Sequence, residues 1–427
     1  MPHIKTQTIV VENFKRLVSC APDDDGEPGP LLGKRMREIG CYEGDLAIGI
    51  RKGRVHFFGY RVDLPPEYQG ATRFDCQGRL VTPALVDCHT HPAFVASRVE
   101  EFLQRVQGAT YEEIAGKGGG ILQTTRMLRQ SPNDALFNAT LRNLTLLRNH
   151  GVAVAECKSG YGLSLEHELR QLRCIVSAAA QLEMHSVGTC LAAHSLPEEY
   201  RGSAARREAY LHLVCEQILP EAARSGMAKR ADVFCERGAF TVEETRRVGN
   251  AAKAVGLEMT IHADQMSASG GAMIAAELKA RSADHLEYTD LMGMKALKDA
   301  GTAAVLLPGS TYYLGQDKWA DARTMINGGL CVALATDFNP GSSPICNPAF
   351  IMHLAVTKLR MSPEEAFSAF TVNAAHALGL TPGEWGCIRE GARAAFAIWD
   401  LRHEREIAYY VGGNMCAGVV TCEGWRE

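Results

Sequence analysis

Short apolar runs alternate with longer amphipathic segments along most of this chain. The runs are rich in β-branched residues, alanine or cysteine and lack clean apolar–polar alternation, which is typical of parallel strands covered on both faces. Eight such runs, each followed by a helical pattern, predict an α/β fold, a (β/α)8 TIM-like barrel. The runs occupy residues 80–91, 151–160, 186–195, 231–238, 256–265, 282–288, 301–310 and 331–341.

Helix start signals support this reading of the segments between the runs. Thr241 is followed three residues later by Glu244, and Ser362 is followed in the same way by Glu365. A Ser or Thr with a Glu at this spacing satisfies two free backbone N–H groups of a helix start. We therefore expect a helix to begin at each of these two positions.

The two ends of the chain show a different pattern, with short strand-like runs broken by turn signals. Runs at 8–14 and 45–60 near one end, and at 389–401 and 406–413 near the other, predict strands. We expect both termini to build one small β-sandwich-like domain beside the barrel. The predicted organisation is 1–79 and 384–427 in the β domain and 80–383 in the barrel. The polar stretch 21–30 is predicted to be a solvated loop.

Composition narrows the class of protein. The 427 residues are 46% hydrophobic and 22% charged, which excludes a disordered or fibrous chain. A net charge of −4 without a dense basic block gives no support for a nucleic-acid or membrane-surface partner. The start lacks an apolar signal region and no run is long enough to span a membrane, so we expect a cytoplasmic protein. Fourteen cysteines without a CxxC spacing predict free thiols.

Polar residues at the ends of the predicted barrel strands are candidates for chemistry, because active sites of such barrels lie at the carboxyl ends of the strands. Five histidines and one aspartate would converge there. The strand-end residues are His89, His91, Lys158, Tyr161, His194, Glu236, His262, Gln265, His285, Asp337 and Asn339.

The His89-Thr90-His91 segment is the sharpest local signal for a metal. Residues i and i+2 of a strand share a face, so both imidazoles can reach one divalent ion at about 2.0–2.1 Å. His262 and Asp337 would supply a further nitrogen and oxygen. Taken alone, however, His262 also fits a buried core histidine, and Asp337 also fits a turn residue.

Longer motifs resemble the imidazolonepropionase family of the amidohydrolase superfamily over roughly residues 80–380. They are FVASR (94–98), EFLQRVQGATYEEI (101–114), GGGILQTTR (118–126), ECKSGYGL (156–163), IHADQ (261–265), SADHLEY (282–288) and ATDFNPGSSP (335–344). The resemblance implies one divalent ion, zinc or iron, held by His89, His91, His262 and Asp337. It also favours a homodimer.

The resemblance further implies a reaction. A metal-activated water would open the cyclic amide of 4-imidazolone-5-propanoate to N-formimidoyl-L-glutamate, a step of histidine degradation. Arg98 would bind the propionate carboxylate of this small-molecule substrate, since a guanidinium pairs with a carboxylate bidentately. His285 would orient the water or carry its proton. Residues expected to contact substrate or product are Tyr161, His194, Gln265, Asn339, Gly341 and Ser342.

Two positions depart from the pattern of some relatives. Gln265 stands where some members, and many related deaminases, carry Glu, and an amide cannot transfer a proton. Proton transfer would then fall to Asp337, His285 or both, and the expected catalytic set is Asp337, His285 and Gln265. Strand four ends in Glu236, with no lysine to be carboxylated, which favours one metal over two.

Two other readings stay open at this point. The same fold and metal could deaminate a purine or pyrimidine, although Gln265 removes a proton donor and Arg98 suits an acidic substrate. The barrel could also bind a metal or ligand without catalysis, although the complete donor set argues against that. The triple glycine at 118–120 lacks a preceding strand and a Gly-Lys-Ser/Thr sequence, so we expect an active-site loop rather than a phosphate loop.

Overall fold

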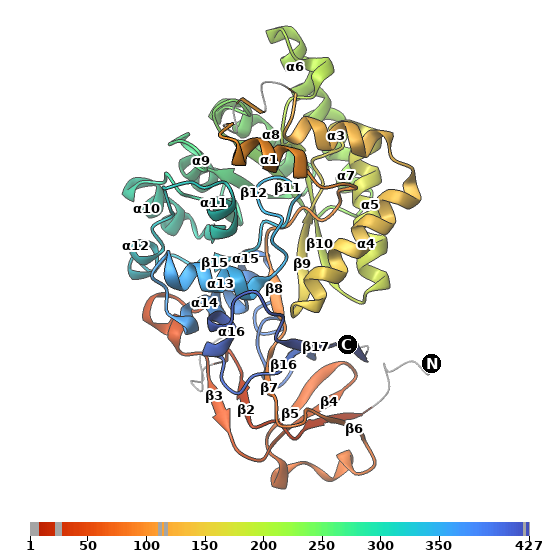
Figure 1. Ribbon diagram of the computed structural model, residues 1–427, viewed down its shortest axis with the longest axis vertical. Helices are drawn as coiled ribbons and strands as arrows, with labels where there is room; N and C mark the ends of the chain where they lie inside the picture. Colours follow the sequence, from red (N-terminus) through yellow and green to blue (C-terminus); the bar gives the residue numbers. More distant parts are fainter. Residues whose placement is uncertain (1–7, 22–27, 110–112, 115–117, 422–423, 427) are drawn as a thin grey trace.

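The computed structural model describes residues 8–21, 28–109, 113–114, 118–421 and 424–426. Its centre is an eight-stranded parallel sheet in the order β15-β14-β13-β12-β11-β10-β9-β8, which confirms the predicted barrel (Figure 1). Beyond the strand ends, Thr90 forms a parallel bridge with Phe338, so the first and last strands also meet. The strands are β8 (Leu85–Asp87), β9 (Val152–Lys158), β10 (His185–Ala193), β11 (Arg230–Cys235), β12 (Glu258–Ala263), β13 (Ser282–His285), β14 (Ala303–Leu306) and β15 (Val332–Leu334).

Helices cover the outside of the barrel, which explains why its strands are largely buried on both faces. Both predicted capping boxes are present, Thr241 with Glu244 before α8 and Ser362 with Glu365 before α14. The helices are α1 (Val99–Val106), α3 (Ile121–Gln130), α4 (Asn133–Asn149), α5 (Leu165–Gln181), α6 (Ala204–Leu213), α7 (Leu219–Arg224), α8 (Val242–Ala254), α9 (Gly271–Glu277), α10 (Leu291–Ala300), α11 (Pro308–Tyr313), α12 (Ala322–Asn327), α13 (Pro348–Thr357), α14 (Pro363–Ala369), α15 (Val372–Ala377) and α16 (Arg405–Tyr409).

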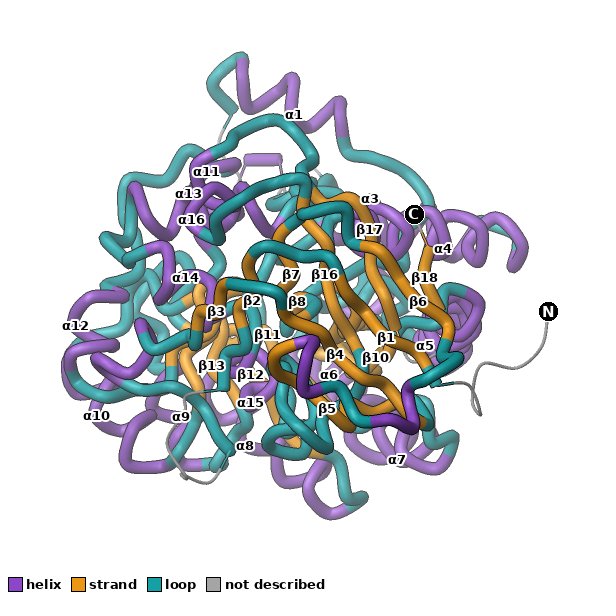
Figure 2. The backbone as a smooth tube through the Cα atoms, turned by 90° about the horizontal axis from the view of Figure 1, so that it is seen from below, coloured by secondary structure: helices purple, strands orange, loops and turns teal. Residues whose placement is uncertain are grey.

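Two further sheets lie at one end of the barrel, as Figure 2 shows from below. The four-stranded sheet contains N-terminal strands alone, and the six-stranded sheet combines strands from both termini. Their orders are β5-β4-β1-β6 and β18-β17-β16-β7-β2-β3. Phe14, Ile48, Val81 and Phe396 belong to one apolar core that both sheets share. The prediction of terminal β-sheets is therefore confirmed. The strands are β1 (Ile9–Glu12), β2 (Arg16–Val18), β3 (Cys41–Glu43), β4 (Leu46–Arg51), β5 (Arg54–Tyr60), β6 (Thr72–Asp75), β7 (Leu80–Pro83), β16 (Ala395–Trp399), β17 (Cys416–Thr421) and β18 (Gly424–Arg426).

The structure differs from the sequence prediction at two strands. The run 80–91 is divided: β7 pairs with β16 and β2 in the terminal sheet, and only β8 enters the barrel. The strand expected at 406–413 is wrong, because α16 forms there with Ile407 and Ala408 buried. A run this short does not distinguish the 3.6-residue period of a helix from the two-residue period of a strand. Packing against α13 favours the helix. The domain division at 79 and 383 stays a prediction.

Other sequence expectations concern the surface and the thiols. In the part of the chain that the structure describes, no helix is both long and apolar enough to cross a membrane. Thirteen cysteines of the described residues are free, as predicted, while Cys422 lies outside them. Most of the loop predicted at 21–30 also lies outside the described residues, which omit 22–27.

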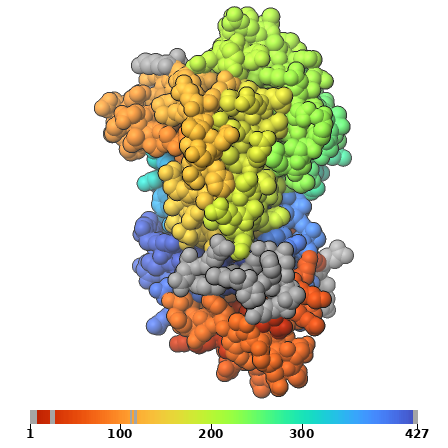
Figure 3. All heavy atoms as spheres, turned by 90° about the vertical axis from the view of Figure 1, so that its right-hand side faces the viewer, coloured from red at the N-terminus to blue at the C-terminus, as the bar shows by residue number. Residues whose placement is uncertain are grey.

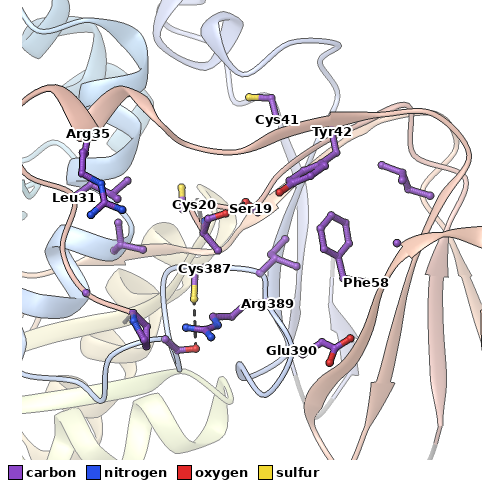
Figure 4. Close-up of a pocket in the computed structure, with 18 of the residues that line it drawn as sticks. Ser19, Cys20, Leu31, Arg35, Cys41, Tyr42, Phe58, Cys387, Arg389 and Glu390 are labelled. Atoms are coloured by element: carbon purple, nitrogen blue, oxygen red, sulfur yellow. Dashed lines mark hydrogen bonds between the residues drawn. The ribbon is translucent and has the colours of Figure 1, made fainter. Parts of the chain in front are cut away.

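A cavity of about 630 Å³ lies between the terminal sheets and the barrel (Figure 4). Tyr42 and Phe58 of the two sheets face it, and Cys387 and Arg389 approach it from the segment after the last barrel helix. It shares no lining residue with the strand-end pocket described next. The cavity is therefore separate from the candidate site.

Candidate active site

His89 and His91 follow β8 and meet Asp337, which follows β15. All three side chains are buried. The Nε2 atoms of the two histidines lie 3.2 Å apart, and each is 3.5 Å from Oδ1 of Asp337. Backbone hydrogen bonds between the two segments fix this meeting, since Asp337 N donates to His89 O at 3.0 Å.

His262 and His285 complete the cluster from the ends of β12 and β13. The ring of His262 lies 4.5 Å from that of His89 and 5.3 Å from that of His285, measured between centroids. Ligand atoms of His89, His262 and His285 lie within 4.8 Å of one another. His285 and Asp337 both have positive φ, 82° and 53°, a strained backbone that recurs at functional sites.

The donor atoms of His89, His91 and Asp337 fit one divalent ion, and those of His262 and His285 group with His89. Burial lowers the pKa values of His89, His91 and His285 well below the ordinary value, so their rings are neutral and can present lone pairs. A tetrahedral site with bonds of about 2.0–2.1 Å has donor atoms about 3.3 Å apart. The 3.2 Å between the Nε2 atoms of His89 and His91, and the 3.5 Å from each to Oδ1 of Asp337, agree with that geometry. Burial also raises the Asp337 pKa well above its usual range, which a nearby cation would reverse.

Two buried carboxylates that sequence reasoning missed lie behind the histidines. Oδ2 of Asp284 is 2.6 Å from Nδ1 of His89, and Oδ2 of Asp232 is 2.9 Å from Nδ1 of His262. The Asp284 contact is a hydrogen bond, and an acceptor on Nδ1 leaves the Nε2 lone pair of the His89 ring free for a metal. Their sequence signal is a charged residue inside an apolar strand run.

Arg98 reaches the same pocket and is held by a partner that sequence reasoning also missed. Its guanidinium pairs with Glu101 Oε2 at 2.9 Å, and both side chains are buried. The other carboxylate oxygen of Glu101 accepts a hydrogen bond from Gly120 N at 2.8 Å. The ion pair therefore connects the expected carboxylate-binding arginine to the glycine segment 118–120. Gly341 also packs against the guanidinium, since a Cβ there would lie 2.3 Å from Cζ of Arg98.

Tyr161 and His194 form a wall of the pocket next to His91. The His91 and His194 rings stack at 5.4 Å, and Tyr161 lies 5.5 Å from His194. Burial lowers the pKa of His194 to about 3, so this ring is also neutral. The pocket of about 40 Å³ shares Phe234 with an adjoining cavity of about 390 Å³ that Gly119 also lines.

Asn339 and Ser342 shape the loop after β15. Asn339 Oδ1 accepts hydrogen bonds from Gly341 N and Ser342 N, both at 2.8 Å, and its Nδ2 donates to Ser342 Oγ at 2.9 Å. The Asn339 amide therefore holds the loop that carries Gly341 against Arg98.

Gln265 lines the pocket beside His262, on the loop after β12. Glu236 holds this loop, since its carboxylate accepts hydrogen bonds from the Met266 and Ser267 backbone at 2.8 and 3.3 Å. Glu236 is thus engaged away from the histidines, in keeping with a single metal.

The structure brings nearly all predicted site residues into one pocket. Two of the predicted residues do not line this pocket: His89 is fully buried, and Gly341 packs against Arg98. Sequence reasoning missed three apolar lining residues, which carry no local signal. The predicted residues that line the pocket are His91, Arg98, Tyr161, His194, His262, Gln265, His285, Asp337, Asn339 and Ser342. The missed apolar ones are Ile121, Phe234 and Met266.

Comparison with known proteins shows the class to which this chain belongs. The sequence profile of the amidohydrolase family matches residues 80–424, so the chain belongs to that family. It is 43% identical over 401 residues to the imidazolonepropionase of Solibacter usitatus, covering 94% of each chain. It is 40% identical over 383 residues to that of Shewanella sediminis, covering 88% of this chain and 91% of the relative. Within the amidohydrolases, the chain is a member of the imidazolonepropionase family.

Solved structures with the same fold include deaminases. E. coli guanine deaminase aligns with a TM-score of 0.74 at 15% identity, covering 98% of this chain and 99% of its own. The 5-methylcytosine deaminase of Klebsiella pneumoniae aligns with a TM-score of 0.71 at 16% identity, covering 98% of both chains. At such low identity the likeness is one of fold alone.

Proposed function

We propose that this protein opens the cyclic amide of 4-imidazolone-5-propanoate to N-formimidoyl-L-glutamate, a step of histidine degradation. One observation carries the proposal: a buried histidine–aspartate donor set and Arg98 reach the same pocket. The family membership supports the same reaction. His89, His91, His262 and Asp337 would hold one zinc or iron ion.

When bound, that ion would polarise the ring carbonyl and lower the pKa of water towards about 7. In the balanced reaction, water oxygen bonds to the carbonyl carbon, the ring C–N bond breaks, and the leaving nitrogen takes up a proton. Asp337, His285 or both would carry this proton. Gln265 cannot do so, and we assign it to binding and orienting the substrate through its amide.

Binding falls to the residues around the donor set. Arg98, fixed by Glu101 and Gly341, would pair with the propionate carboxylate. Tyr161 and His194 would contact the ring or the product from the adjacent wall. Asn339 and Ser342 would contact the substrate from the loop after β15, and Gly341 would act through Arg98, against which it packs.

The test follows the absorbance decay of the imidazolone with the protein before and after treatment with a chelator. We expect turnover by the untreated protein, its loss after chelation, and its recovery on adding back zinc or iron. Full turnover by metal-free protein would contradict the proposal. Metal binding without any turnover would instead indicate a non-catalytic barrel.

Deamination is the competing reaction, because some solved structures of this fold are deaminases. The test is ammonia release from guanine and from cytosine bases under the same conditions. We expect none, since Gln265 offers no carboxylate for proton transfer to a leaving amine. Rapid ammonia release without imidazolone turnover would contradict our proposal and indicate a deaminase.

We further propose that the protein is a cytoplasmic homodimer. The described cysteines are free thiols, and free thiols are typical of proteins in a reducing compartment such as the cytoplasm. Exposed apolar side chains on α1, among them Phe102, Leu103 and Val106, support self-association. The orange spheres near residue 100, at the upper left of Figure 3, mark this part of the surface. Light scattering after size exclusion measures the state, and a monomer at all concentrations would contradict the dimer.

A further inference from the structure

We propose that Lys158 is a positioning residue, whose ammonium group holds the two carboxylates that orient the candidate metal-binding histidines. Lys158 ends β9 and its side chain is fully buried. The ammonium nitrogen lies 2.7 Å from Asp232 Oδ2, 2.8 Å from Glu156 Oε2 and 3.6 Å from Asp284 Oδ2. The reaction described above leaves this cluster without a role.

The same carboxylate oxygens contact both the ammonium and the histidines. Asp232 Oδ2, which accepts from Lys158, lies 2.9 Å from Nδ1 of His262. Asp284 Oδ2, next to Lys158, lies 2.6 Å from Nδ1 of His89. Lys158 is thus connected through one carboxylate to each of two donor histidines that belong to different strands.

The barrel makes this cluster possible. Adjacent parallel strands place Asp232 beside Thr260 and His262 beside Asp284 in register, so their side chains share the interior. Lys158 enters from β9 on the far side of β10, and its Nζ also lies 3.4 Å from Thr260 Oγ1. A long side chain is needed to join strands that do not pair directly.

Charge pairing explains why these buried groups lie together. Three buried carboxylates surround one ammonium, and an unpaired buried charge is strongly unfavourable. His89, Glu156 and Asp284 place potential cation ligands within 4.8 Å of one another, and the ammonium supplies the positive charge there. The ammonium thus lies beside the two carboxylate oxygens that contact Nδ1 of His262 and Nδ1 of His89, and holds both in place.

The inference rests on the proposed metal site, and its test measures the metal directly. Lys158→Met keeps an unbranched side chain but removes the charge and the hydrogen bonds. We expect its zinc dissociation constant, measured by competition with a chelating indicator, to rise about 10–100-fold. We also expect the absorption spectrum of the Co²⁺-loaded variant to change, since the donor geometry changes. Neither readout requires turnover.

A matched control removes another buried cation of a barrel strand. Arg230, at the start of β11, contacts Glu258 and the Leu378 carbonyl and none of the histidines. Arg230→Met should lose stability yet keep the wild-type zinc affinity and Co²⁺ spectrum. An equal loss of zinc affinity in Lys158→Met and Arg230→Met would show that Lys158 only stabilises the fold, and would overturn the inference.

A second pair of variants keeps the inference testable if Lys158→Met does not fold. Asp232→Asn and Asp284→Asn preserve side-chain size and each break one connection, so each should weaken zinc binding and alter the Co²⁺ spectrum. Unchanged zinc affinity and Co²⁺ spectrum in the Lys158 variant, or in both Asn variants, would overturn this inference but leave the proposed metal site in place. A wild-type protein that binds no divalent ion would overturn the proposed metal site as well.

Discussion

At the scale of single residues, the chemistry of each candidate side chain depends on a neighbour distant in the sequence. His89 faces Asp284, and Arg98 lies against Gly341. The strand-end polar residues could be predicted because barrel topology alone brings strand ends together. Their partners could not, since a buried aspartate in an apolar run has no local signal for which imidazole it meets.

Asp337→Asn should abolish turnover, because the variant loses an anionic donor and a proton acceptor while keeping the side-chain shape. Steady-state kcat and bound metal per chain are the measurements. A near-normal kcat would remove Asp337 from the candidate site.

Gly341→Ala should raise KM for the propionate substrate by at least about tenfold with a smaller effect on kcat. The added Cβ would lie 2.3 Å from Cζ of Arg98, whose guanidinium is held by Glu101 and cannot move freely. Arg98→Lys should act in the same direction. Gly29→Ala is the control, because a Cβ there meets open space. An unchanged KM in both site variants would separate Arg98 from substrate binding.

At the scale of elements, local chemistry predicted helix starts well and strand identity less well. Thr241 and Glu244 cap α8 because their hydrogen bonds lie within one turn. The run at 406–413 has no such local signal, so contact with α13 decided its helical form. The division of 80–91 into β7 and β8 also depends on partners, since each half pairs with a different sheet.

Glu244→Gln should lower stability by about 1 kcal/mol or less at neutral pH, through loss of the charged pair with Arg207. Partial burial would raise the pKa of Glu244, but hydrogen bonds from Arg207 and from Thr241 N lower it below its ordinary 4.5. A depressed pKa means that this stabilisation is present above about pH 4.5 and is lost as the pH falls through the folded-state value.

Thermal unfolding of wild type and Glu244→Gln across this range measures the effect, and the difference between them should shrink on acidification. Glu243→Gln removes a charge from the same helical turn and serves as the control. A difference that grows at acidic pH would contradict the assignment.

At the scale of the whole molecule, the terminal sheets and the barrel are joined by buried polar contacts as well as by the continuous chain. Asn373 Oδ1 accepts from Leu31 N at 2.8 Å, and its Nδ2 donates to Leu31 O and Val332 O, both at 2.9 Å. One side chain of α15 therefore connects the N-terminal segment to strand β15.

Asn373→Ala should lower the free energy of unfolding by roughly 2–4 kcal/mol, because it leaves buried backbone groups of Leu31 without partners. Asn414→Ala removes two exposed hydrogen bonds, one donated to Asn149 O and one accepted from Cys416 N, and should change stability by about 0.5 kcal/mol or less. Urea unfolding of both variants measures the difference. Equal effects would show that the Asn373 contacts do not stabilise the joint.

The sequence by itself determined the barrel, the β-rich termini and the strand-end histidines, because periodicity, capping and strand order are local properties. Only the tertiary structure decided what lies between and behind those histidines. Lys158 meets Asp232 and Asp284 because closing the barrel puts β9, β11 and β13 around one interior. Burial and distance set the charge states there, and no linear pattern encodes either one.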